Sequence, residues 1–244
     1  MKPIMKLLAP IIILLCSPHI NAQNPDSLAP VLRLFDAGES RIYLLGTVHG
    51  AHARNHIFTW PHLERVLSVL RPDMLLVEIR PEHFRPEEFY SDGPPEMTYL
   101  VFLASHKGIR CRGIDWWPDD WLFNIASLTG DDFEHREDSM MANIAGETAR
   151  AKLHTVLVTT GAGHIDGFVR RFTARGWKEL PCPPFDLAVS GYPDLPSEVI
   201  QMWEQGAEYL TKTRIGSTDR IRQKVETLRA MAREGGYEFV REKK

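Results

Sequence analysis

Two segments of the sequence carry a histidine three residues after a glycine, where an apolar run ends. Residues 42–50 read Ile-Tyr-Leu-Leu-Gly-Thr-Val-His-Gly, and residues 156–164 read Val-Leu-Val-Thr-Thr-Gly-Ala-Gly-His. Imidazole is the commonest metal ligand in proteins and the usual proton shuttle near neutral pH. Each pattern is typical of a buried strand that runs into a loop, and open α/β sheets bind ligands at the carboxyl ends of their strands. We therefore expect His49 and His164 to belong to one site.

Two acidic residues also follow expected strands. Glu78 comes directly after the apolar residues 74–77, where a charge needs a partner to be buried. It either pairs with an arginine or serves as a metal ligand or general base. Asp115 follows the expected strand 109–114 and can equally cap the next turn. Because the carboxyl ends of parallel strands meet at one edge, we expect both carboxylates to lie beside the two histidines.

Two imidazoles and one carboxylate form the ligand set of a catalytic metal with an open position for water. The sequence therefore predicts His49, Glu78 and His164 as metal ligands, with the imidazole of His164 facing a cleft rather than filling the core. Manganese, cobalt and zinc are the candidate ions. Such an ion lowers the pKa of its bound water and polarises a carbonyl or phosphoryl group.

Arg136 shares a helical face with Met140 and Ile144, at spacings of four and eight residues. Those apolar side chains should face the core, so an arginine on the same face needs an anion, either a site carboxylate or the substrate. The alternative is that Arg136 lies in the first helical turn and reaches solvent. We group Arg136 with Glu78 and Asp115 as predicted catalytic residues.

The elements that would position these residues alternate between strand and helix. This alternation predicts an α/β fold with a mixed, mainly parallel central sheet flanked by helices. Residues 31–35 and 41–45 flank a turn and indicate a leading hairpin. Further strands are expected at 74–77, 109–114, 154–160 and 177–180. Helices are expected at 63–70, 97–106, 131–152 and 165–174, with another beginning at Trp116, and Asp131 or Asp132 is the expected cap of the long helix.

The chain of 244 residues divides into three predicted parts. Residues 1–22 have the plan of a secretory signal peptide, with two lysines, an apolar run too short to span a bilayer, and a small residue, Ala22. Residues 23–190 form the expected α/β domain. Residues 191–244 carry two apolar stripes at helical spacing and are expected to be an amphipathic helical extension that packs on the domain or on a partner.

The signal segment predicts an exported protein, periplasmic or secreted. If it is not cleaved, it is the expected point of membrane contact. An exported chain can oxidise Cys111 and Cys182, and two buried free thiols are the alternative. The formal charge of −3 offers no basic surface for nucleic acid. The expected partner is therefore a peptide or small-molecule substrate, and the sequence leaves the oligomeric state open.

In the order of these motifs along the sequence, the chain resembles the TraB/GumN family. That family belongs to a wider group that includes Tiki proteases, ChaN-like haem-uptake proteins and erythromycin esterases. The resemblance covers about residues 30–182 and is carried by residues 45–50, 75–78, 113–115, 136 with 140–141, and 161–164. It implies an α/β domain with His49, Glu78 and His164 grouped at one site and Arg136 supporting them. Family members often follow that arginine with Asn or Asp, whereas Glu137 and Asp138 stand here.

The resemblance and the residues together predict an exported metal-dependent hydrolase, in the first place a Tiki-like peptidase. Two alternatives stay open. One is a binding module without turnover, in which the histidines hold haem or another ligand beside an apolar slot lined by Tyr99, Trp116 and Trp117. The other is a partner-binding protein whose site is vestigial and whose C-terminal helices dock the partner.

Overall fold

The computed structural model describes residues 32–49, 58–84, 93–117, 129–150, 152–187, 189, 198–199 and 201. The predicted signal peptide lies outside the described residues, as does nearly all of the predicted C-terminal extension. The helix expected to begin at Trp116 also runs into residues that are not described.

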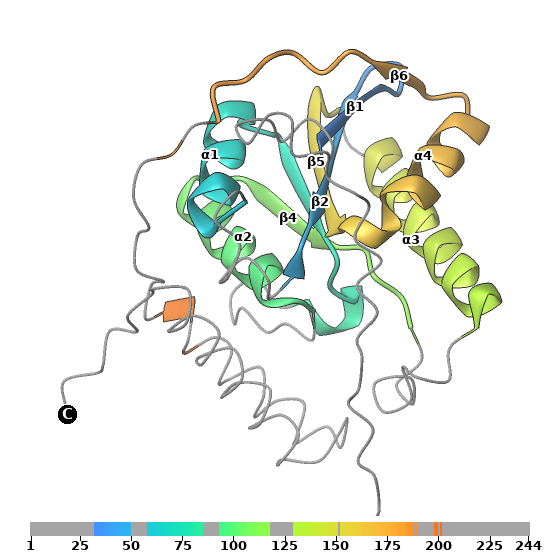
Figure 1. The fold of residues 1–244 in the computed structure, drawn as a ribbon, viewed down its shortest axis with the longest axis horizontal. Helices are drawn as coiled ribbons and strands as arrows, with labels where there is room; N and C mark the ends of the chain where they lie inside the picture. Colours follow the sequence, from blue (N-terminus) through green and yellow to red (C-terminus); the bar gives the residue numbers. More distant parts are fainter. Residues whose placement is uncertain are drawn as a thin grey trace, which may run out of the picture.

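The predicted fold class is confirmed, because the described chain forms a mixed six-stranded sheet flanked by helices (Figure 1). The strand order is β4-β3-β5-β2-β1-β6, in which β4, β3, β5 and β2 are parallel neighbours, while β1 pairs antiparallel with β2 and with β6. The strands are β1 (Leu32–Asp36), β2 (Arg41–Thr47), β3 (Met74–Val77), β4 (Arg110–Gly113), β5 (Thr155–Gly161) and β6 (Lys178–Leu180).

Four α-helices cover the sheet, two on each face (Figure 1). Helices α1 (Trp60–Leu70) and α2 (Pro95–His106) pack on one face, and α3 (Gly130–Arg150) and α4 (Ile165–Ala174) pack on the other. Short 3-10 turns, η2 (Pro81–His83) and η5 (Ala162–His164), follow β3 and β5. No helix in the described part of the chain is long and apolar enough to span a bilayer.

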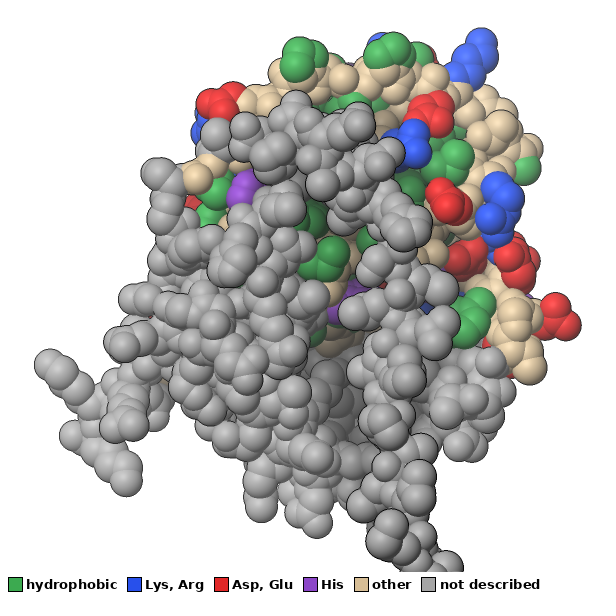
Figure 2. Space-filling model, in the orientation of Figure 1, with side chains coloured by type: hydrophobic (Ala, Val, Ile, Leu, Met, Phe, Trp, Pro, Cys, Tyr) green, Lys and Arg blue, Asp and Glu red, His purple; other side chains and the backbone are tan. Residues whose placement is uncertain are grey.

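The central strands are apolar at nearly every position because both faces of the sheet are covered. In β5, Leu157 packs with the α1 and α2 side of the core, whereas Val156 and Val158 pack with the α3 and α4 side. In β3, Leu75 and Leu76 divide in the same way. The space-filling view shows acidic and basic side chains interspersed over the described surface at the α3 and α4 side (Figure 2).

Helix α3 begins one residue earlier than expected, and its cap is a correction to the sequence interpretation. Asp131 or Asp132 was the expected cap, but Thr129 holds that place. The Thr129 hydroxyl accepts the Asp132 backbone N–H at 3.3 Å, and the Asp132 carboxylate accepts the Thr129 N–H at 2.8 Å. This reciprocal pair is a capping box, in which two otherwise unpaired donors at the helix start are satisfied.

Cys111 and Cys182 belong to segments at opposite edges of the sheet. Cys111 is on β4, and Cys182 is two residues after β6, with the other four strands between them. Strands are about 4.8 Å apart in a sheet, so the separation far exceeds the roughly 7 Å between Cα atoms that a disulfide can bridge. Both thiols are free, which excludes the intrachain disulfide that the sequence left open.

The strand register aligns the ends of the four parallel strands. Thr47 of β2 pairs with Gly161 of β5, and Val77 of β3 pairs with Thr159 of β5 and with Gly113 of β4. All four strands therefore finish within two residues of the same level. The residues that follow them stand side by side along one edge of the sheet.

Candidate active site at the carboxyl edge of the sheet

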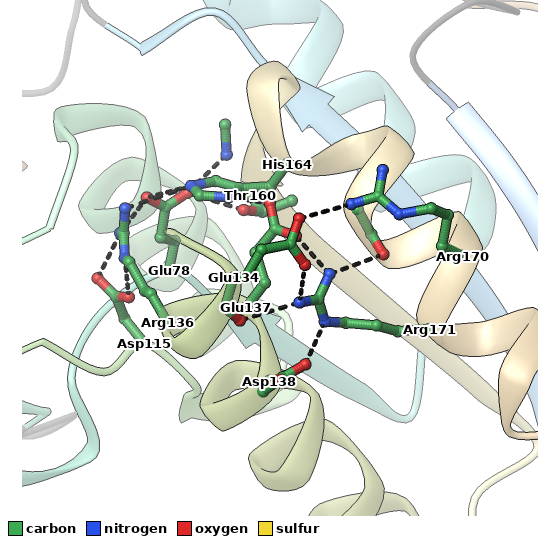
Figure 3. A network of polar contacts seen from close by, with 12 residues as sticks. Glu78, Asp115, Glu134, Arg136, Glu137, Asp138, Thr160, His164, Arg170 and Arg171 are labelled. Carbon is green, nitrogen blue, oxygen red and sulfur yellow. Dashed lines mark hydrogen bonds and ion pairs between the residues drawn. The ribbon is translucent and has the colours of Figure 1, made fainter. Parts of the chain in front are cut away.

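The four strand-end residues predicted from the sequence follow four neighbouring strands. Asp115, Glu78, His164 and His49 come after β4, β3, β5 and β2, which is the order of these strands in the sheet. Arg136 reaches the same edge from the second turn of α3 (Figure 3). The structure thus brings together residues that are far apart in the sequence.

Arg136 links three of these side chains (Figure 3). Its guanidinium donates to Asp115 through Nε and Nη2, both at 2.8 Å, and to Glu78 Oε1 at 2.7 Å. Its Nη1 lies 3.2 Å from His164 Nε2. The side chain is 13% exposed, so Arg136 turns toward the site carboxylates and not toward solvent. The predicted need for an anion is confirmed, and Glu78 and Asp115 meet it.

Glu78 is almost completely enclosed, with 2% of its surface exposed. Its Oε2 accepts the Gly161 backbone N–H at 2.6 Å and the Thr160 hydroxyl at 2.9 Å, while Oε1 accepts Arg136. Burial alone would raise its pKa, but the charges of Arg136 and His49 and the hydrogen bond from the Gly161 N–H hold the pKa well below its usual range. Glu78 is therefore a fixed anion, and the ion pair that the sequence left as an alternative is present.

Asp115 hydrogen-bonds both to Arg136 and to the backbone. Its carboxylate accepts Nε and Nη2 of Arg136, and its Oδ1 also accepts the N–H of the next residue, Trp116, at 2.8 Å. Burial and the neighbouring Glu78 carboxylate raise its pKa, while Arg136 acts in the opposite direction. Two buried acids therefore share one guanidinium.

His164 is held from both sides of its ring. Arg136 can only donate, so Nε2 of His164 is the acceptor of that bond, and the ring proton sits on Nδ1. This Nδ1 lies 2.9 Å from Glu137 Oε1, which accepts a hydrogen bond from it. The residue is 8% exposed, so the prediction that its imidazole faces an open cleft is wrong. The cause is α3, which places Arg136 and Glu137 over the ring.

His49 lies on the more open side of the site, with 47% of its side chain exposed. Its Nδ1 is 2.8 Å from Oε1 of Glu96, a fully buried carboxylate of α2 that also accepts the Thr47 hydroxyl at 2.7 Å. Burial lowers the pKa of His49, but the hydrogen bond and the charge of Glu96, with Glu78, outweigh it and raise the pKa to about 9. At neutral pH His49 is an imidazolium.

Gly161 explains how His49 approaches Glu78. A Cβ built on this glycine would overlap the Nε2 end of the His49 ring and lie 3.5 Å from Glu78 Oε2. The imidazole and the carboxylate therefore face each other across a position that a side chain would fill. This is a physical reason for glycine at the first position of the second Gly-x-x-His motif.

The aromatic residues proposed for a haem slot are used in other ways. Tyr99 is 3% exposed and packs edge-on against Trp60 in the core, with ring centroids 5.4 Å apart. Trp116 packs edge-on against His135. The Cζ atom of Arg136 lies over the ring of Trp117, 5.4 Å from the ring centroid, which is the geometry of a cation–π contact.

The donor types at this edge suit a first-row divalent ion, but their arrangement does not. Arg136 occupies Oε1 of Glu78 and Nε2 of His164, and Oε2 of Glu78 already accepts two donors. Within the described ranges, no three His, Cys, Asp or Glu side chains stand close enough to hold a metal. The site as it lies is organised around the guanidinium of Arg136.

Two functional side chains were missed from the sequence. Glu96 and Glu137 each contact one of the Gly-x-x-His imidazoles, yet Glu96 stands in the first turn of α2, where an acid is common for helix-dipole reasons. Glu137 belongs to the run Glu-His-Arg-Glu-Asp, which has the composition of a solvated helix face. Glu137 directly follows Arg136, and no pattern in the sequence indicated that its side chain is buried.

Comparison with protein-family models, with curated proteins and with solved structures found no match for this chain. The resemblance to the TraB/GumN family therefore rests on the quoted motifs alone.

Proposed function

We propose that this protein is an exported hydrolase that cleaves a peptide bond or a related acyl bond at the carboxyl edge of its sheet. The observation that carries the proposal is the contrast between two imidazoles beside one buried carboxylate. His49 is half exposed and charged, whereas His164 is buried and accepts a hydrogen bond from Arg136. Pairs of titratable groups held in different protonation states are typical of acid–base catalysis.

In this proposal the accessible His49 touches the substrate. Water attacks the carbonyl carbon while the imidazolium polarises the carbonyl oxygen. As the C–N bond breaks, the imidazolium gives its proton to the leaving amine and takes back the proton that the attacking water loses. Glu78 is held ionised beside it and stabilises that proton on His49 until the substrate takes it. Arg136 balances the two buried acids, Glu78 and Asp115, and keeps the site rigid.

The sequence also predicted a divalent metal held by His49, Glu78 and His164. Arg136 would have to leave Glu78 Oε1 and His164 Nε2 before an ion could reach those atoms. The roles above need no such ion, and metal dependence is a separate part of the proposal that metal addition decides.

The test is hydrolysis of a mixed peptide library by the purified protein, read by mass spectrometry, with EDTA or with added Mn²⁺, Co²⁺ or Zn²⁺. We expect cleavage that is lost in His49→Ala and in Glu78→Gln. His106→Ala is the matched control, because His106 is an exposed histidine at the far end of α2 and its ring hydrogen-bonds to Phe102 and Ser105 of its own helix. Cleavage that both site variants retain would refute the proposal.

The same sample separates the alternatives. Activity that EDTA removes and one ion restores supports the predicted metal, whereas activity unchanged by EDTA supports the guanidinium-centred site. A Soret band in the absorption spectrum, with no cleavage, would favour the haem-binding alternative.

A further inference from the structure

Each of the two Gly-x-x-His imidazoles is held through Nδ1 by a buried glutamate from a helix. Glu96 of α2 holds His49 from one face of the sheet, and Glu137 of α3 holds His164 from the other. The Nδ1 to Oε1 distances are 2.8 and 2.9 Å. The two histidines thus have the same support although their surroundings differ.

The burial of these carboxylates singles them out from their neighbours. On α3 the side chains of Glu134 and Asp138 are 57% and 69% exposed, whereas that of Glu137 is 9% exposed. Glu96 is fully buried although it lies in the first turn of its helix. A buried carboxylate is costly unless it is paired and hydrogen-bonded. The imidazole is one partner of each acid, beside the Thr47 hydroxyl at Glu96 and Arg171 at Glu137.

Two glycines make room for the two glutamate–histidine pairs. A Cβ on Gly167 of α4 would overlap the carboxylate of Glu137, and a Cβ on Gly161 would overlap the ring of His49. Arg171, from the same helix as Gly167, also donates to Glu137 Oε2 and to exposed Glu134 and Asp138 (Figure 3). The backbone and side chains of α4 are thus fitted to the position of Glu137.

We infer that Glu96 and Glu137 are positioning residues of the site, each holding one imidazole by Nδ1 so that its Nε2 faces Glu78. The Nε2 of His164 lies 3.9 Å from Glu78 Oε1, and the Nε2 end of His49 faces Glu78 Oε2 across Gly161. A carboxylate on the far nitrogen fixes both the tautomer and the plane of an imidazole. The tautomers follow from the contacts alone, and the kinetic consequence rests on the proposed hydrolase activity.

The variant Glu137→Gln tests this most sharply. Arg171 donates to Oε2 of Glu137, so the carbonyl oxygen of the glutamine will turn toward Arg171 and its amide group toward His164. Nδ1 of His164 then faces a donor, as Nε2 already faces the donor Arg136, so the ring proton has no acceptor at either nitrogen and the single Nδ1 tautomer is lost. Glu134→Gln is the matched control, because it also loses a contact with Arg171 but does not touch a histidine.

The readout is the ¹⁵N chemical shift of each imidazole nitrogen in ¹⁵N-histidine-labelled protein, with resonances assigned through single histidine variants. We expect wild-type His164 to carry its proton on Nδ1 alone and wild-type His49 to carry one on Nδ1. We expect Glu137→Gln to remove the single Nδ1 tautomer of His164, and Glu134→Gln to leave the proton in place. Glu96→Leu, which removes the acceptor of His49, should leave that ring with both tautomers.

A wild-type His164 protonated on Nε2, or a Glu137→Gln protein with an unchanged tautomer, would overturn the inference. The wild-type spectrum decides even if a variant fails to fold. Where the protein is active, Glu137→Gln should lower the rate of hydrolysis by about 10- to 100-fold while Glu134→Gln does not. A shifted tautomer in a protein without any hydrolysis would sustain the positioning role and refute the proposed function.

Discussion

Strand β3 has a carboxylate at each end, and both carboxylates accept hydrogen bonds from β5 or from the residue next to it. Asp73, just before β3, accepts the backbone N–H groups of His154 and Thr155 at 2.7 and 2.9 Å. Glu78, just after β3, accepts the Gly161 N–H and the Thr160 hydroxyl at 2.6 and 2.9 Å. The same acid-to-strand contact therefore occurs twice on one pair of strands, about 15 Å apart along the chain direction.

The surroundings of the two carboxylates are opposite. Asp73 is exposed, and the hydrogen bond from Thr155 is the main cause of its lowered pKa. Glu78 is 2% exposed, and its pKa is low because the charges of Arg136 and His49 and the Gly161 N–H outweigh its burial. Hydrogen bonds to β5 are thus sufficient to hold an end of β3 in place. The buried cation and the imidazoles are what distinguish the candidate active site from a structural cap.

The largest expected effect comes from removing the cation of the buried end. Arg136→Met leaves Glu78 and Asp115 buried without their shared guanidinium, which should lower the free energy of unfolding by about 3–5 kcal/mol. Urea denaturation at pH 7 measures this. Arg136→Lys should recover only part of the loss, because an ammonium cannot reproduce the forked contact with Asp115.

The control for this prediction neutralises the acids instead. Adding Glu78→Gln and Asp115→Asn to Arg136→Met removes the uncompensated charges, so it should restore part of the lost stability. An Arg136→Met protein as stable as the wild type would show that water reaches these acids. In that case burial would no longer distinguish Glu78 from exposed Asp73.

The second prediction compares two glycines at the buried end. Gly167→Ala should cost about 1–3 kcal/mol, because the new methyl group overlaps the Glu137 carboxylate, which His164 and Arg171 hold in place. Gly161→Ala should cost less stability, because the overlapped His49 ring is half exposed and can turn outward, but it should abolish hydrolysis. Thermal melts and peptide cleavage on the same samples check both results, and equal stability losses would contradict the difference in rigidity.

Much of this arrangement could be predicted from the sequence, because strand ends are local features. The apolar runs before His49, Glu78, Asp115 and His164 determine where each strand stops, and parallel pairing then brings the ends together. The face that Arg136 shares with Met140 and Ile144 likewise indicated its direction.

The remainder depends on packing between elements that are distant in the sequence. Whether His164 is buried depends on how α3 crosses the end of β5, and no local pattern reports that angle. Glu96 and Glu137 have the sequence context of solvated helix residues, and only their imidazole partners distinguish them. The fixed tautomer of His164 likewise requires the position of the Arg136 guanidinium.

The third prediction concerns alkaline pH and His49, which follows β2 and lies beside Glu78 at the buried end of β3. The pKa of His49 is raised from 6.5 to about 9, so its pairing with Glu96 stabilises the fold fully below pH 6.5 and is lost as the pH rises through 9. Water screens the half-exposed imidazole and reduces the effect. The melting temperature of the wild type should therefore fall more steeply between pH 6.5 and 9 than that of His49→Gln; parallel curves would contradict the raised pKa.

The smallest expected effect is at the exposed end of β3. Asp73→Asn keeps one acceptor oxygen but loses the charge, so it should cost about 1 kcal/mol or less and leave hydrolysis unchanged. Because the pKa of Asp73 is lowered from 3.8, its contribution is present above pH 3.8 and is lost as the pH falls through the lower folded value. Urea denaturation of both proteins from pH 7 to pH 2 should therefore show a difference that vanishes in acid. If Asp73→Asn instead reduced hydrolysis as much as Glu78→Gln, the strand contact itself would support catalysis, and the buried cation would not be what separates the two ends.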